Sequence, residues 1–195
     1  MNFVILHGTL GSPNDNWYPW LTTEIENKRH TTFRPQLPTP EGQTLENWVK
    51  IIRQTLISLD QPSNETVIVA HSMSTLAVCH YLASLHDAIK ACYFIAGFAD
   101  RLPNTPDPYP TLNNPFIDSP INWAHVKENC EFFTCFASDN DPYVPFDIAM
   151  NFAKRLSAEF IKVPGAGHFN VSSGYKEFPL LLETMQRRVL NDTDI

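Results

Sequence analysis

The chain has 195 residues, of which 43% are hydrophobic and 18% are charged. These values are typical of a globular protein with one sizeable core and exclude a disordered chain, so we expect one domain over residues 1–195. The formal net charge is −7 and no run of basic residues occurs, which argues against binding to nucleic acid or to anionic membranes.

Targeting signals and cysteine usage both lead us to expect a cytoplasmic protein. Strand-like residues begin at Asn2, with no leader before them, so we expect no signal peptide, and no apolar run is long enough to cross a bilayer. The four cysteines form no C-x-x-C pair and are interpreted as reduced thiols. No metal-ligand spacing and no phosphate loop occurs, so we expect no metal and no other cofactor.

The predicted elements alternate between strands and helices along the chain. We expect strands over 3–6, 31–33, 66–70, 91–96, 132–137 and 160–163, and helices over 17–27, 46–59, 73–85, 123–129, 145–156 and 178–190. This alternation indicates an α/β fold, in which helices cover both faces of a parallel sheet. Residues 98–120 contain six prolines and little periodicity, so we predict a long loop there, the one candidate for a cap over a site.

A strand, a sharp turn and a helix meet at Ser72, which is the arrangement of a nucleophile elbow, G-x-S-x-G. Ala70 and Ser74 stand where this motif has glycine, and both are small, so the stretch is a degenerate form of the motif. A turn of this kind also occurs without catalysis. The stretch alone therefore leaves a structural and a catalytic interpretation open.

Three residues at predicted strand ends favour the catalytic interpretation. Ser72, Asp141 and His168 each follow a strand, and the carboxyl ends of parallel strands share one edge of a sheet. Serine needs a base to become a nucleophile, a neutral imidazole can accept its proton, and a carboxylate can orient that imidazole. The order serine, aspartate, histidine is that of the α/β hydrolases.

Two choices within this site stay open in the sequence. Asp139 competes with Asp141 for the carboxylate role, because aspartates also stabilise loops. An oxyanion hole needs two backbone N–H groups, which we assign to Met73, directly after the serine, and to Thr9, with Leu10 as the alternative to Thr9. The other two histidines at strand ends, His7 and His71, are interpreted as structural.

Several motifs resemble one family along nearly the whole chain. These motifs are His7-Gly8, Trp17-x-x-Trp20, Arg34-Pro35-x-Leu37-Pro38, Ala70-His71-Ser72-Met73-Ser74, Asp141-Pro142-Tyr143-Val144-Pro145 and Gly165-Ala166-Gly167-His168-Phe169. The chain resembles the small single-domain α/β hydrolases, the serine hydrolase family of retinoblastoma-binding protein 9 and YdeN. The resemblance implies a three-layer α/β/α sandwich with a six-stranded, mostly parallel sheet. It also implies Ser72 as nucleophile, Asp141 as orienting carboxylate and His168 as base.

We therefore expect a serine hydrolase, an esterase that cleaves small carboxylic esters through an acyl-enzyme. Apolar residues near the predicted site suggest an apolar pocket, although they are equally typical of a core. They are Leu10, Trp17, Phe98, Tyr143 and Phe169. The same triad also permits thioesterase or peptidase chemistry. A different class of function is a protein-binding module on a hydrolase scaffold with an unproductive triad, for which the sequence names no partner.

Overall fold

A six-stranded sheet forms the centre of the computed structural model, which describes residues 1–59, 63–85, 87–103 and 105–190. The strands are β1 (Asn2–Leu6), β2 (Thr31–Phe33), β3 (Thr66–His71), β4 (Ile89–Ile95), β5 (Cys130–Ser138) and β6 (Glu159–Val163). Their order is β2-β1-β3-β4-β5-β6, and every neighbouring pair is parallel. The predicted α/β fold is thus confirmed.

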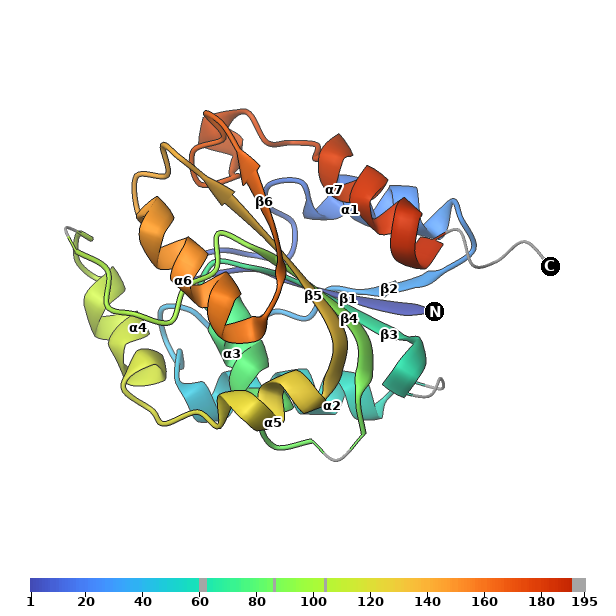
Figure 1. Ribbon diagram of the computed structural model, residues 1–195, viewed down its shortest axis with the longest axis horizontal. Helices are drawn as coiled ribbons and strands as arrows, with labels where there is room; N and C mark the ends of the chain where they lie inside the picture. The colour runs from blue at the N-terminus through green and yellow to red at the C-terminus, as the bar shows by residue number, and fades with distance from the viewer. Residues whose placement is uncertain (60–62, 86, 104, 191–195) are drawn as a thin grey trace.

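Helices cover both faces of this sheet and make three layers (Figure 1). One face carries α1 (Tyr18–Glu26) and α7 (Pro179–Met185), which a π-helical turn, η3 (Gln186–Leu190), continues. The other face carries α2 (Leu45–Ile57), α3 (Met73–Leu82), α5 (Trp123–Glu128) and α6 (Phe146–Leu156). Two short 3-10 turns, η1 (Ser63–Glu65) and η2 (Val171–Ser173), lie before β3 and α7 respectively.

Alternating side chains explain the two cores. In β1, Val4 packs with the helices of the α3 side and Ile5 with those of the α1 side, because successive strand residues point to opposite faces. Both side chains are fully buried, which is why the parallel strands read as continuous apolar runs rather than alternating ones. Predicted element ends differ from the observed ones by a few residues; for example, α3 ends at Leu82 instead of 85.

The prediction of an uninterrupted loop over residues 98–120 is wrong, because the segment contains α4 (Tyr109–Ile117). Pro110 lies in the first turn, where an N–H would have no partner within the helix, so it does not oppose helix formation. Pro115 removes a single bond near the other end. The fully buried Phe116 packs against Trp48 with ring centroids 5.2 Å apart, and this contact anchors α4 to α2.

All four cysteines are buried free thiols: Cys79, Cys92, Cys130 and Cys135. Burial raises the pKa of Cys79, Cys92 and Cys135. Within the described ranges, no helix has the length and apolar character needed to cross a membrane.

Candidate active site

Ser72 lies at the turn between β3 and α3 in a strained backbone conformation. Its φ is 59° and its ψ is −129°, in a region that residues other than glycine rarely adopt. The Ser72 N–H donates to the carbonyl oxygen of Ile95 over 2.8 Å and so holds the turn against β4. Ser72 Oγ has no hydrogen-bond partner in the described part of the chain and lines a cavity, so the hydroxyl is free to meet a ligand.

The small residues around this turn explain how the degenerate motif is accommodated. Ser74 Oγ accepts a hydrogen bond from the His71 N–H (3.1 Å) and lies 3.2 Å from the Leu6 carbonyl oxygen, so it ties the ends of β1 and β3 together. Gly8 has no room for a side chain, because a Cβ there would stand 2.8 Å from Ser72 Cβ. The loop after β1 therefore touches the turn at Ser72 directly.

Asp141 and His168 form a buried pair beside this turn. Nδ1 of His168 is 2.7 Å from Oδ2 of Asp141, whose side chain is only 2% exposed. The other carboxylate oxygen accepts from the N–H groups of Tyr143 (2.9 Å) and Val144 (3.0 Å). A carboxylate cannot donate, so Nδ1 of His168 carries the proton, and in the neutral ring Nε2 is left as an acceptor.

Asp139 is engaged elsewhere. Its carboxylate accepts from the Gly165 N–H (2.9 Å) and pairs with Lys162 Nζ (2.9 Å), and these two donors lower the pKa of Asp139. Asp139 therefore fastens the loop after β6, while Asp141 is the aspartate that contacts His168.

A second group of contacts holds the loop that carries His168. Asn16, Trp17 and Tyr18 form what we call the 16–18 clamp. Trp17 Nε1 donates to the Phe169 carbonyl oxygen (3.0 Å), and Asn16 Oδ1 accepts from the Val171 N–H (3.0 Å). Phe169 has a φ of 52°, an unusual value that its neighbours must hold in place.

The third contact of the clamp runs through His71. Tyr18 Oη is 2.6 Å from His71 Nδ1, and His71 Nε2 is 2.9 Å from the His168 carbonyl oxygen. Burial lowers the pKa of His71 to about 3, so the ring is neutral and has one donor and one acceptor. The carbonyl can only accept, so Nε2–H donates to it and the Tyr18 hydroxyl donates to Nδ1. His71 thus orients the His168 loop from behind.

The backbone groups predicted for the oxyanion hole have different partners. The N–H groups of Thr9 and Met73 donate to no protein group within the described residues, whereas the Leu10 N–H donates to Thr39 Oγ1 (2.8 Å). Leu10 is thereby engaged and Thr9 is free, which favours the first of the two alternatives. Met73 is the first residue of α3, where the helix dipole favours negative charge.

A buried polar network that no sequence pattern indicated supports the Thr9 loop. Gln43 Nε2 donates to Thr9 Oγ1 (2.9 Å) and to Asn113 Oδ1 (3.1 Å), and Thr9 Oγ1 donates to the same Asn113 oxygen (2.6 Å). Gln43 Oε1 accepts from Thr39 Oγ1 (2.7 Å). The network joins residues that are far apart in the chain. A helix predicted over residues 109–117 would have been the one hint of it in the sequence, because α4 supplies Asn113.

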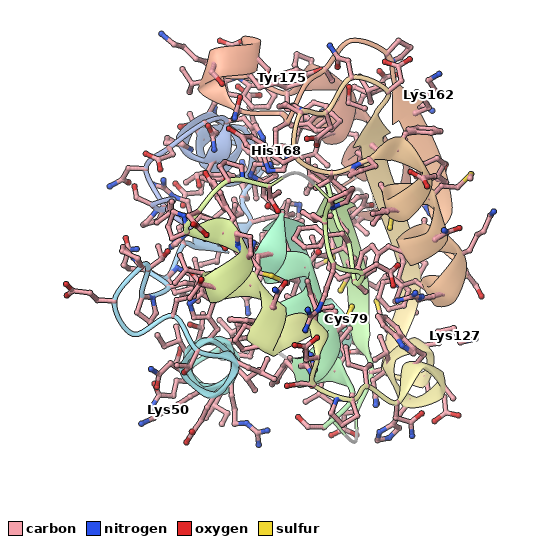
Figure 2. All side chains as sticks on the ribbon, turned by 90° about the vertical axis from the view of Figure 1, so that its left-hand side faces the viewer. Lys50, Cys79, Lys127, Lys162, His168 and Tyr175 are labelled. Atoms are coloured by element: carbon pink, nitrogen blue, oxygen red, sulfur yellow. The ribbon has the colours of Figure 1, made fainter. Side chains whose placement is uncertain are left out.

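Two cavities meet at Ser72 and His168. The larger, of about 550 Å³, is an open cavity that includes Leu10 in its wall, and the smaller, of about 80 Å³, includes Phe98 and Tyr143. Trp17 and Phe169, which were also predicted near the pocket, lie in the core on the α1 side, and both are fully buried. Figure 2 shows His168 in the upper half of the molecule, far from Lys50 at its lower edge.

No cluster of three or more His, Cys, Asp or Glu side chains suited to a metal occurs in the parts of the chain that the structure describes. Among the described residues, the site brings together the Ser72 hydroxyl, the imidazole acceptor of His168 and two N–H groups that donate to no protein group.

Known proteins resemble this chain over most of its length. The Bacillus subtilis protein YdeN is 24% identical over 93% of this chain and 92% of its own length, and its crystal structure superposes with a TM-score of 0.87 over 96% of this chain and 97% of that one. The rat serine hydrolase RBBP9 is 24% identical over 85% of this chain and 86% of its own. The family described as Serine hydrolase matches residues 3–187, and this chain belongs to it.

Proposed function

We propose that the protein is a carboxylic-ester hydrolase that works through an acyl-enzyme on Ser72. The observation that carries the proposal is the 2.7 Å bond between Asp141 and His168, because it leaves Nε2 of His168 as a base in a cavity that it shares with Ser72. The strained turn and the unpaired Thr9 and Met73 N–H groups add the other parts that acyl transfer requires.

In the proposed reaction, Ser72 Oγ attacks the ester carbonyl carbon while His168 Nε2 accepts the hydroxyl proton. The carbonyl oxygen becomes an oxyanion that the N–H groups of Thr9 and Met73 stabilise. The intermediate collapses, the bond between the acyl carbon and the alcohol oxygen breaks, and His168 gives the proton to the departing oxygen. A water molecule, deprotonated by His168, then cleaves the acyl-enzyme in the same way and restores the Ser72 hydroxyl.

A fluorophosphonate probe tests this proposal, because an activated serine displaces its fluoride and becomes phosphonylated. We expect one adduct per chain on Ser72 by mass spectrometry, hydrolysis of p-nitrophenyl butyrate, and loss of both in Ser72→Ala. Ser74→Ala is the matched control, because Ser74 is buried and should not be labelled. Failure of the folded wild-type protein to label, with circular dichroism as the check of folding, would refute the proposal and favour the binding-module alternative.

A further inference from the structure

The two cavities beside Ser72 differ in size and in how open they are to solvent, and this difference divides the substrate into two parts. We infer that the acyl group transferred to Ser72 is a short chain, no longer than butyryl, and that the alcohol is a larger group that carries polar atoms. The inference rests on the proposed function, since it assigns the two sides of the ester that Ser72 would attack.

The small cavity is the less open of the two, and its wall contains both apolar and polar side chains. Its volume is about 80 Å³, well below the roughly 300 Å³ at which pockets begin to hold drug-sized ligands. Phe98 and Val144 in its wall are each 1% exposed. Tyr109 of α4 packs on Tyr143 with ring centroids 5.6 Å apart, and both residues belong to the wall of this cavity. A long chain has no space here unless these side chains move.

The open cavity is large and carries polar groups. Its volume is about 550 Å³, and its wall includes the exposed residues Asn14, Asp15 and Lys176. Lys176 forms no ion pair with a described residue, so its charge is available to a ligand. Leu10 and Val171 are its apolar members, 42% and 45% exposed.

The reaction order assigns each part of the ester to a cavity. The alcohol must leave and water must enter while the acyl group is still bound to Ser72, so the alcohol needs the side that is open to solvent. The acyl group stays until the second half of the reaction, which the less open cavity permits. The small cavity therefore receives the acyl chain, and the open cavity receives the alcohol.

An acyl-length series with one leaving group tests the assignment. With p-nitrophenyl acetate, butyrate and octanoate, we expect kcat/KM for octanoate to be at least about tenfold below that for butyrate, since each misfitting methylene changes discrimination by about 10–200-fold. Glyceryl monobutyrate should be cleaved with a higher kcat/KM than n-butyl butyrate, because its alcohol part is polar.

Two matched leucine variants locate the effect. Leu102 is a half-buried wall residue of the small cavity, so Leu102→Ala should raise the octanoate-to-butyrate ratio of kcat/KM by about tenfold. Leu10→Ala, in the wall of the open cavity, should leave this ratio unchanged and alter the ratio between the two alcohols. An unaltered ratio in Leu102→Ala, or octanoate cleaved as well as butyrate by the wild type, would overturn the inference while leaving esterase activity and probe labelling intact. Absence of labelling and of all hydrolysis would refute the proposed function itself.

Discussion

Tyr18 gives the sharpest test of how the His168 loop is held. Tyr18 is 1% exposed, and its hydroxyl donates to Nδ1 of the neutral His71 over 2.6 Å. Tyr18→Phe keeps the ring and its packing but leaves Nδ1 buried without a donor. A buried acceptor that loses its partner costs about 1–3 kcal/mol, so we expect the free energy of unfolding to fall by about that amount.

Urea unfolding followed by tryptophan fluorescence measures this change, because Trp17 packs on Tyr18 with ring centroids 4.7 Å apart. Tyr175→Phe is the matched control, since the Tyr175 hydroxyl forms no hydrogen bond with the described residues; its loss should change stability by less than about 0.5 kcal/mol. His71 still donates to the His168 carbonyl in Tyr18→Phe, so kcat/KM should fall by less than about tenfold, or about 1.4 kcal/mol. His71→Phe removes that donor as well and should lower kcat further. Equal stability of Tyr18→Phe and Tyr175→Phe would show that the clamp does not support the loop as described.

Two further predictions concern protonation. Asp141→Asn should lower kcat by about 10³–10⁴, because an amide no longer selects the tautomer with a free Nε2. Asp139→Asn should keep a kcat near that of the wild type, since its side-chain oxygen still accepts from the Gly165 N–H. Hydrolysis of p-nitrophenyl butyrate measures both, and similar losses in the two variants would contradict the assignment. The His71 pKa, lowered to about 3 in the folded state from 6.5, means that only the unfolded chain binds this proton between those values. The contribution of His71 to stability should therefore be fully present above about pH 6.5. Below this pH, the folding equilibrium constant should fall by up to about tenfold per pH unit. Urea titrations at several pH values should show a shallower decline in His71→Phe, and parallel declines would refute the neutral assignment.

The sequence predicts the parts of this molecule that depend on local pattern. Apolar runs followed by helical periodicity identify the strands, and their parallel arrangement brings Ser72, Asp141 and His168 to one edge of the sheet. The missed helix α4 shows where local pattern misleads. A count of prolines treats every proline as unfavourable to a helix, whereas the real cost of a proline depends on its position in the helix.

Tertiary contacts are what the sequence leaves undetermined. Asp139 and Asp141 are two residues apart in one loop, and only the packing of the β6 loop shows which of them reaches His168. The interpretation of His71 as structural stays a prediction, and the contact of its ring with the His168 carbonyl oxygen, 97 residues away, has no local signal in the sequence. The Gln43 and Asn113 network is likewise formed only when α4 packs on the loop after β1.

The contact of Gly8 with Ser72 has a consequence for how such a protein can change. Because a Cβ on Gly8 would stand 2.8 Å from Ser72 Cβ and 3.1 Å from the His71 carbonyl oxygen, this position of the loop accepts no side chain. The walls that Leu102 and Tyr109 contribute to the small cavity consist, in contrast, of side chains. New substrate preferences are therefore more accessible by substitution in those walls than at the turn, and a directed-evolution library would be best confined to them.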